Sequence, residues 1–445
     1  MSNTAYMVNG FDVARTGQLK DQRLKSIVER RANALGPGYK LFYRAPVELV
    51  RGEGVYVYDN DGNSYLDAYN NVPSVGHCHP HVTAAIAAQA AVLNTHTRYA
   101  SSQLVDYAER LLGTYPDEIA NVMFTCTGSE AVDLALRIAR FFTGGTGVVV
   151  TENAYHGLTT AAAEISPQLG PNVPIGTHVW TVPAPRPDRA DGADVGEAFA
   201  ADIRTAVTDM QRHGVRFAAF IADTLFSTDG ILPEPAGFLT RAVEEVHAGG
   251  GLYIADEVQP GFGRTGERMW GFQRHGIVPD LVVMGKPMGN GMPIAGVAAR
   301  PELLSEFGTK VRYFNTFGGN SVSIAAANAV LDVIENENLV QNCRDVGAYL
   351  KAGITELAQH DDVLAGIRGS GLYIAVDVVD PGTGDPDADR TMQLVNGLRE
   401  RRVLISATGK SASTLKIRPP LPFASNHADI FLQEFSAALT DLRSR

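Results

Sequence analysis

The strongest constraint on the fold is a regular alternation of short apolar segments with amphipathic helical segments, which begins near residue 80. Gly, Asp or Pro bounds each apolar segment, as is typical of strands. Strands connected through helices imply βαβ crossovers and a mostly parallel sheet buried between helical layers. The expected strands are 121–125, 147–151, 178–182, 217–222, 252–256, 281–284 and 294–298. The expected helices are 81–93, 102–113, 129–142, 195–212, 237–248, 321–336, 339–358, 388–400 and 427–443.

Both ends of the 445-residue chain follow a different pattern. After an expected helix at 18–35, three short strands at 47–50, 55–58 and 64–67 form a meander around an Asn/Asp/Gly-rich turn. Near the C-terminus, strands are expected at 371–377, 403–405 and 415–417. We therefore expect an α/β fold with a large domain, residues 76–320, and a small α+β domain formed by residues 1–75 and 321–445.

Composition excludes several classes of function. The chain has 38 basic and 49 acidic residues, a net charge of −11, which argues against nucleic acid as a partner. No apolar run reaches the length of a membrane span, and residues 1–19 contain no apolar core of a secretory signal. Three widely separated cysteines do not form a disulfide framework and suit a reducing compartment. A cytoplasmic protein is expected.

Three motifs have better structural explanations than functional ones. Residues 261–266, GFGRTG, match a dinucleotide-binding pattern but do not lie directly between a strand and a helix. Residues 409–411, GKS, lack the glycine five residues earlier that a P-loop requires. Residues 77–81, HCHPH, have no second ligand cluster that would close a metal site, so a turn into the next helix is the better interpretation. No metal site is predicted.

Two loops that follow strands offer groups for a phosphorylated ring. Gly128 and Ser129 open a helix after strand 121–125, where free backbone N–H groups and the helix dipole favour a phosphate. The alternative is a capping box between Thr127 and Glu130. Tyr155 follows strand 147–151 and has a face that can stack on a planar heterocycle, although it can equally be an ordinary loop aromatic.

Two charged residues end buried strands. Asp256 would be costly there without a cation, either a protonated pyridine nitrogen or a nearby Arg or Lys. Lys286 would become a nucleophile if burial lowered its pKa, and a surface lysine is the alternative. A phosphate site, a stacking ring, a carboxylate and an amine together are what pyridoxal 5′-phosphate requires.

With these residues in view, the chain resembles the class-III aminotransferases, a family of fold-type I pyridoxal-phosphate enzymes. The resemblance extends from Tyr56 to Pro420 and is most diagnostic at residues 255–259, 261–266 and 284–286. It implies a catalytic Lys286 that forms the Schiff-base link to the cofactor and an Asp256 that pairs with the pyridinium nitrogen.

The resemblance also implies how the remaining cofactor contacts are made. Tyr155 and Val258 would pack on opposite faces of the ring, and Gln259 would lie near its phenol oxygen. Gly128 and Ser129 would hold the phosphate. Thr316, within residues 313–319, would reach the phosphate from a second subunit, which implies a homodimer with shared active sites.

The shared machinery does not choose between transamination and β-elimination. Several stretches resemble the ethanolamine-phosphate phospho-lyase branch: 70–72, 75–80, 93–95, 98–99 and 313–319. Aminotransferases of the class usually carry Glu-Pro where this chain has Asp223-Thr224, and the lyase branch keeps the glutamate, so Asp223 departs from both.

Further residues are candidates for substrate contact. Arg418 matches the family's carboxylate-binding arginine and would bind a carboxylate or a phosphate, with an interface salt bridge as the alternative. His77, Arg98 and Asp223 are further candidates. The leading hypothesis is a phospho-lyase that converts O-phosphoethanolamine, or a similar small amino phosphate, into an aldehyde, ammonia and phosphate. The alternative is an ω-aminotransferase that passes an amine to pyruvate or 2-oxoglutarate.

Overall fold

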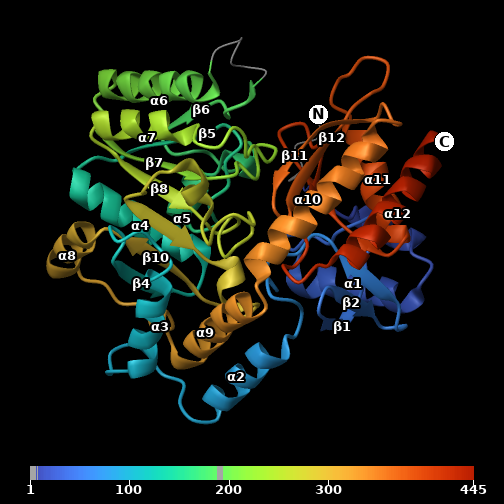
Figure 1. Ribbon diagram of the computed structural model, residues 1–445, viewed down its shortest axis with the longest axis horizontal. Helices are drawn as coiled ribbons and strands as arrows, with labels where there is room; N and C mark the ends of the chain where they lie inside the picture. The colour runs from blue at the N-terminus through green and yellow to red at the C-terminus, as the bar shows by residue number, and fades with distance from the viewer. Residues whose placement is uncertain (1–6, 8, 188–193, 445) are drawn as a thin grey trace.

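The large region of the protein is built on a seven-stranded sheet, seen in a computed structural model that describes residues 7, 9–187 and 194–444 (Figure 1). The strand order is β4-β10-β9-β8-β7-β5-β6. Four of the six neighbouring pairs are parallel, and β10 runs antiparallel to both of its neighbours, so the sheet is mostly parallel as predicted. The strands are β4 (Asn121–Thr125), β5 (Gly147–Thr151), β6 (Val179–Val182), β7 (Phe217–Asp223), β8 (Leu252–Asp256), β9 (Leu281–Met284) and β10 (Ala295–Ala299).

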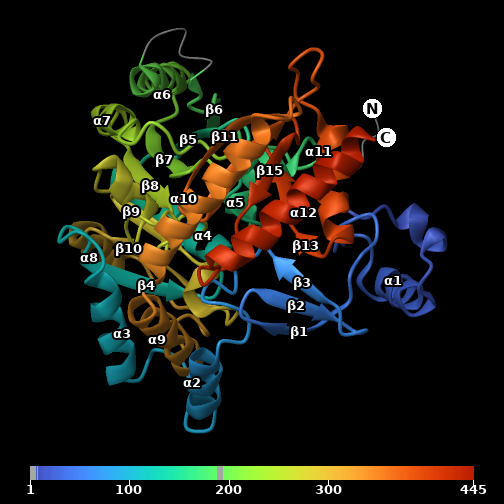
Figure 2. The same ribbon diagram turned by 45° about the vertical axis from the view of Figure 1, so that its right-hand side comes forward.

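Helices cover both faces of this sheet (Figures 1 and 2). Alternate residues of a strand point to opposite faces. In β8, Ile254 packs into a core with α4, whereas Tyr253 packs into a second core with α6 and α7. The helices of the large region are α2 (Pro80–Ala90), α3 (Ser102–Leu112), α4 (Gly128–Thr143), α5 (Thr160–Glu164), α6 (Val195–Arg212), α7 (Leu239–Ala248) and α8 (Pro301–Lys310). Short 3₁₀ turns are Pro167–Leu169, Gly271–His275 and Lys286–Gly289.

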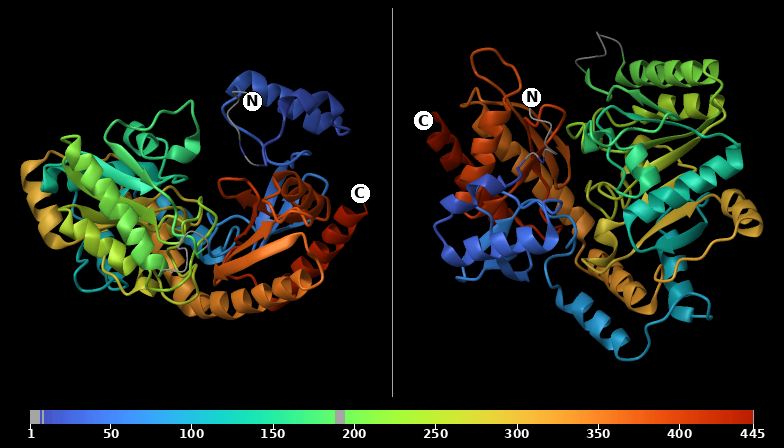
Figure 3. Two further views of the ribbon diagram at one scale, coloured as in Figure 1. Left: turned by 90° about the horizontal axis from the view of Figure 1, so that it is seen from above. Right: turned by 180° about the vertical axis from the view of Figure 1, so that it is seen from behind.

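The two ends of the chain fold together beside the large region (Figure 3). Residues from β13 pair in parallel with β3, which joins the C-terminal region to the N-terminal meander. One small sheet has the order β1-β2-β3-β13 and the other β11-β12-β15-β14. The strands are β1 (Leu49–Glu53), β2 (Tyr56–Asp59), β3 (Ser64–Asp67), β11 (Leu364–Ser370), β12 (Tyr373–Val378), β13 (Val403–Leu404), β14 (Ser406–Thr408) and β15 (Thr414–Ile417). The helices are α1 (Gln22–Leu35), α10 (Leu339–Ala358), α11 (Ala388–Glu400) and α12 (Ser425–Arg443), whereas α9 (Ser321–Asn336) packs mainly against α2 and α3 of the large region.

The fold class, a large α/β region with a small α+β region built from both termini, is therefore confirmed. The helices at 195–212, 321–336, 339–358 and 388–400 have the predicted bounds. The helix predicted at 18–35 is instead a 3₁₀ turn, Val13–Gln18, followed by α1, because the Asp21 side chain caps a new helix start. The division of the chain at residues 75 and 320 stays a prediction.

No helix within the described residues has the length and apolar character needed to span a bilayer.

Candidate active site

The predicted cofactor residues converge on one cavity of about 320 Å³ at the carboxyl ends of the parallel strands. Open parallel sheets bind ligands at this edge, because loops leave the strands there. Seven of the predicted cofactor-binding residues line this cavity: Gly128, Ser129, Tyr155, Asp256, Val258, Gln259 and Lys286. The rest of the wall is formed by Val72, Cys126, Thr127, His156, Gly157 and residues 291–294.

The N-terminus of α4 forms one end of the cavity. The Thr127 hydroxyl accepts a hydrogen bond from the Glu130 N–H at 3.2 Å, and the Glu130 carboxylate accepts from the Thr127 N–H at 3.3 Å. The capping box that the sequence suggested is therefore present, and it fixes the helix start without using the N–H groups of Gly128 and Ser129 as its donors. A Cβ atom on Gly128 would lie 3.2 Å from Val258, so glycine keeps the helix start close to that cavity residue.

Asp256 ends β8 and is held by two donors. Its Oδ2 lies 2.7 Å from Nδ1 of His156, and its Oδ1 accepts from the Val258 N–H at 3.1 Å. Asp256 and His156 are each only 5% exposed, so the pair is removed from bulk water. The Tyr155 hydroxyl has a raised pKa because of burial and the nearby charge of Asp256.

Lys286 follows β9 and its side chain stands in the cavity. Its side chain is exposed to the space of this cavity. Desolvation and the positive charge of Arg418 lower the pKa of its amine, and Asp256 and Asp223 partly oppose this effect. A lowered pKa increases the fraction of neutral amine, the form that acts as nucleophile and base.

Gln259 lines the cavity and also forms hydrogen bonds with residues of the small region. Its Oε1 accepts hydrogen bonds from the Tyr373 hydroxyl and the Lys416 ammonium, each at 3.1 Å, and from the Arg418 guanidinium. Lys416 is 7% exposed and Arg418 is 4% exposed. Desolvation and the charge of Arg418 set the pKa of Lys416 well below its ordinary value. A buried cation, Arg418, and a buried amine with a lowered pKa, Lys416, therefore lie directly behind a residue of the cavity wall.

Asp223 is the residue on β7 that pairs in register with Asp256 on β8. Its carboxylate accepts from the backbone N–H groups of Leu225 at 2.9 Å and Ser227 at 3.3 Å. Burial and the charge of Asp256 raise its pKa. Asp223 does not line the cavity itself.

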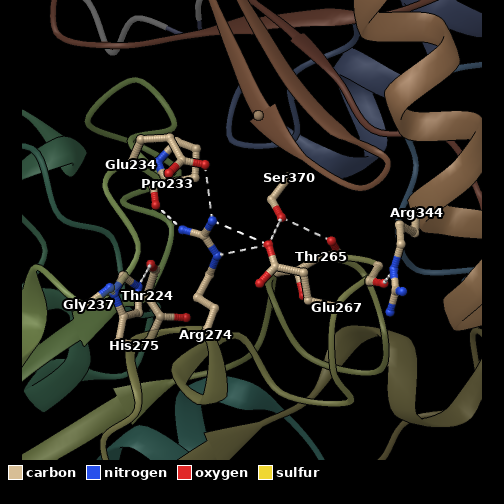
Figure 4. Close-up of polar contacts among 12 residues, drawn as sticks. Thr224, Pro233, Glu234, Gly237, Thr265, Glu267, Arg274, His275, Arg344 and Ser370 are labelled. Carbon is tan, nitrogen blue, oxygen red and sulfur yellow. Dashed lines mark hydrogen bonds and ion pairs between the residues drawn. The ribbon is translucent and has the colours of Figure 1, made fainter.

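The loop that follows Asp223 is fixed by a polar network (Figure 4). Arg274 bonds Glu234 at 3.1 Å and Glu267 at 3.3 Å, and it also donates to the Pro233 carbonyl. Ser370 of β11 donates to Glu267 at 2.9 Å. The small region is thus connected through Glu267 and Arg274 to the loop that follows β7.

Three predicted residues lie away from this cavity. His77 bonds the buried Asp67 at 2.7 Å through Nε2. The Arg98 guanidinium lies 3.8 Å from the ring centroid of Phe314, beside a different cavity. Thr316 is exposed on the surface of the chain. Their roles at the active site stay predictions.

Sequence reasoning missed three residues of the site: His156, Tyr373 and Lys416. His156 lies beside the predicted Tyr155, and Lys416 lies two residues before the predicted Arg418. Alternation along β15 places Lys416 and Arg418 on the same side of the strand, which is the signal that identifies Lys416. Tyr373 is brought to Gln259 only by tertiary packing, and no local pattern indicates it.

Comparison with known proteins agrees with this geometry. The sequence profile of aminotransferase class-III matches residues 42–439. An alanine–glyoxylate aminotransferase 2-like protein of Drosophila melanogaster is 39% identical over 431 residues, 93% of this chain and 86% of that protein. An ethanolamine-phosphate phospho-lyase homologue of Caenorhabditis elegans is 37% identical over 430 residues, 92% of each chain. A phospholyase from Arthrobacter, solved in complex with phosphoethanolamine, superposes with a TM-score of 0.90 at 44% identity, over 93% of this chain and 99% of that one.

The chain belongs to the class-III aminotransferase family, whose members are pyridoxal-phosphate-dependent enzymes. The cavity fits this cofactor. The start of α4 offers backbone donors to a phosphate, Asp256 offers a buried carboxylate to a ring nitrogen, and Lys286 offers an amine with a lowered pKa. Gly128 keeps open a space that a Cβ atom would narrow.

Proposed function

We propose that this enzyme is a phospho-lyase that releases phosphate from O-phosphoethanolamine or a similar small amino phosphate. The other products are an aldehyde and ammonia. The observation that carries the proposal is the buried Arg418 guanidinium behind Gln259, with the Lys416 amine beside it. Within the described residues, none of the hydrogen-bond or ion-pair partners of Lys416 and Arg418 is a carboxylate. A desolvated guanidinium that no carboxylate bonds favours an anionic substrate group nearby, and an anion there would also favour protonation of Lys416.

The similarity to phospho-lyases supports this choice of anion. The Arthrobacter phospholyase covers nearly the same chain length and was solved with an amino phosphate bound. Arg418 is held at its base by a bond from Nε to the Tyr69 carbonyl at 3.1 Å, and Nη1 donates to Gln259. The planar geometry of a guanidinium suits phosphate oxygens.

Lys286 is the proposed acid–base residue, as the family resemblance implied. Because its pKa is lowered, its amine can accept the proton from the substrate carbon that carries nitrogen. Pyridoxal phosphate, when bound, supplies the electron sink that makes this proton acidic. In a lyase this electron pair would form a double bond to the neighbouring carbon while the C–O bond to phosphate breaks, and phosphate would leave with the electrons of that bond. Water would then hydrolyse the resulting unsaturated amine to the aldehyde and ammonia. Arg418 would stabilise the charge of the leaving phosphate.

We also propose that the enzyme is a homodimer with shared sites. Five large apolar side chains around Thr316 and Arg98 are exposed: Val92, Leu93, Tyr99, Phe314 and Phe317. The two loops that carry them are in contact, since His96 lies 5.1 Å from the Tyr99 ring and 5.9 Å from the Phe314 ring. A contiguous apolar patch of this kind is typical of a subunit interface. Light scattering should give twice the chain mass, and Phe317→Asp should yield monomers that bind the cofactor weakly. A cytoplasmic location stays a prediction.

The reaction is tested by incubating the loaded enzyme with phosphoethanolamine in the absence of a keto acid. A lyase should release phosphate and aldehyde through many turnovers, because elimination returns the cofactor to its starting form. Lys286→Ala should release none. A parallel incubation with pyruvate or 2-oxoglutarate should not change the rate.

The ω-aminotransferase alternative gives the opposite result. Without a keto acid it would stop after one turnover, and with one it would form an amino acid in step with amine consumption. That outcome, with no phosphate release, would contradict the proposal.

A further inference from the structure

The Arg418 guanidinium lies against two aromatic rings. Its Cζ atom is 5.1 Å from the ring centroid of Tyr69 and 5.5 Å from that of Tyr373. The face of an aromatic ring carries negative charge density and attracts a cation, most strongly where water is excluded. Because Arg418 is only 4% exposed, these rings replace part of the stabilisation that the guanidinium loses with its water.

An arginine with aromatic partners differs from one that is paired with a carboxylate. A carboxylate accepts hydrogen bonds in the plane of the guanidinium and offsets its positive charge. An aromatic face attracts the cation without a formal negative charge, so the guanidinium keeps its full charge for an incoming anion. Among the described residues, no carboxylate bonds Arg418. The aromatic rings therefore hold this cation without neutralising it.

Tyr69 contacts Arg418 through two separate groups. Its backbone carbonyl accepts a hydrogen bond from Nε at 3.1 Å, and its ring supplies the aromatic face. A substitution of the side chain therefore removes the face and keeps the carbonyl. Tyr373 does not allow this separation, because its ring also lies 5.5 Å from the Lys416 amine and its hydroxyl bonds Gln259.

The turn that follows β3 fixes the position of Tyr69. One carboxylate oxygen of Asp67 accepts from the N–H groups of Tyr69 at 3.1 Å and Asn70 at 2.9 Å. The other oxygen bonds the His77 ring at 2.7 Å. In addition, the Phe42 ring meets the Tyr69 ring edge-on, with centroids 5.6 Å apart and planes at 89°. The aromatic partner of Arg418 is thus in place before a ligand binds, which lowers the ordering cost of binding.

We propose that Tyr69 is a positioning residue whose aromatic face, in place of a carboxylate, fixes the Arg418 guanidinium for capture of the substrate phosphate. The inference rests on the proposed role of Arg418 in phosphate binding. It assigns this task to the ring of Tyr69 and not to its hydroxyl. Loss of the ring should therefore weaken substrate binding and leave cofactor binding unchanged.

The binding of inorganic phosphate to the holoenzyme tests this directly, because bound pyridoxal phosphate is expected to fill the phosphate site at the start of α4. We compare Tyr69→Phe, which keeps the ring, with Tyr69→Leu and Tyr69→Met, which remove it. Titration calorimetry should give a Kd about three- to tenfold higher for the Leu and Met variants, the ordering cost of one long side chain. Tyr69→Phe should bind phosphate as wild type does.

Kinetics and cofactor affinity distinguish positioning from general damage to the fold. The Leu and Met variants should raise KM for phosphoethanolamine by the same factor, with kcat and the Kd of pyridoxal phosphate unchanged. The matched control is Tyr58→Leu, because the Tyr58 ring lies 3.5 Å from the guanidinium of the exposed Arg51. This control should change none of these constants. Thermal unfolding of each variant shows that it folds.

A double-mutant cycle with Arg418→Ala tests whether Tyr69 acts through Arg418. Once the guanidinium is absent, Tyr69→Leu should have no further effect on phosphate affinity. Three results would each overturn the inference: an equal effect of Tyr69→Leu in both backgrounds, an unchanged phosphate affinity in the Leu and Met variants, or an equal loss of affinity in Tyr69→Phe.

Arg418→Ala alone separates failure of this inference from failure of the proposed site. If the wild type binds no phosphate, or if Arg418→Ala binds it as well as wild type, the proposed anion site is wrong and the inference falls with it. If Arg418→Ala weakens phosphate binding while the Leu and Met variants do not, only the inference on Tyr69 is wrong.

Discussion

The Gln259 amide oxygen and the Tyr373 hydroxyl form a 3.1 Å hydrogen bond between the cavity wall and β12 of the small antiparallel sheet. Lys416 of β15 and Arg418, directly after β15, converge on the same oxygen, and β15 pairs with β12 in register. The small region therefore determines where Lys416 and Arg418 lie relative to the cavity. Changes to this sheet should affect substrate binding more than cofactor binding.

Removal of the Arg418 guanidinium should weaken the capture of an anionic substrate. We expect Arg418→Ala to lower kcat/KM for phosphoethanolamine by the equivalent of about 2–5 kcal/mol, the range for a desolvated charge pair. Arg418→Lys should recover part of this loss, because it keeps the charge but not the planar donors. Steady-state kinetics measure both. Arg204→Ala, which breaks an exposed ion pair with Glu245, is the matched control and should leave kcat/KM unchanged. An Arg418→Ala enzyme with wild-type kcat/KM would exclude this arginine from substrate binding.

Replacement of Lys286 should remove the covalent attachment of the cofactor and all turnover. Lys286→Ala lacks both the nucleophile and the proposed proton acceptor. Mass spectrometry after borohydride reduction should detect cofactor bound to the wild type and not to the variant. Lys310→Ala, at an exposed lysine paired with Glu306, should retain the label and the activity. Turnover at the wild-type rate in Lys286→Ala would contradict the assignment.

Gly157 should not tolerate a side chain, because the turn that carries it contacts the start of α4. A Cβ atom at Gly157 would lie 2.6 Å from the Ser129 hydroxyl oxygen and 3.0 Å from its Cα, and the residue has φ of +148°. The same hydroxyl accepts from the Leu158 N–H at 3.0 Å. We expect Gly157→Ala to destabilise the protein by about 1–3 kcal/mol and to weaken cofactor binding.

Gly308 provides the comparison for this substitution. It lies in α8, and a Cβ atom there would meet nothing within 4 Å. Gly308→Ala should therefore stabilise the protein by about 0.5–1 kcal/mol and leave cofactor affinity unchanged. Denaturant unfolding and cofactor titration measure both variants. Equal stability of the two alanine variants would show that the turn at Gly157 is not closely packed.

Local sequence predicts most of the elements of this fold, because strand and helix periodicities are strong where a segment faces one core. It misses β11, Leu364–Ser370. The burial of this strand does not alternate regularly, and two glycines and an arginine interrupt its apolar pattern. At the site, residues that follow a strand end were predictable, as Asp256 and Lys286 illustrate. Tyr373 and the link from His156 to Asp256 were not, since both contacts join segments about 100 residues or more apart.

His275 should make the stability of the protein fall at mildly acidic pH. Its ring is buried, with Nδ1 accepting from the Gly237 N–H at 3.2 Å and Nε2 bonded to the Thr224 carbonyl at 3.3 Å (Figure 4). Burial lowers its pKa from 6.5 to about 4. Above pH 6.5 the ring is neutral in both folded and unfolded chains and contributes no pH dependence. Between pH 6.5 and 4 only the unfolded chain binds the proton, so unfolding is favoured by up to about 3 kcal/mol as the pH falls.

The contribution of His275 is isolated by difference, because other buried groups act with the opposite sign. Burial raises the pKa of Glu257 to about 7, so the folded chain binds a proton there first and gains stability as the pH falls. We therefore compare the free energy of unfolding of wild type and His275→Gln across pH 4 to 7. Glutamine can donate to the Thr224 carbonyl but does not titrate. The variant should be less stable than wild type near pH 7, and the gap should close or reverse toward pH 4. A gap that is constant across this range would show that the folded chain protonates His275 at its ordinary pKa.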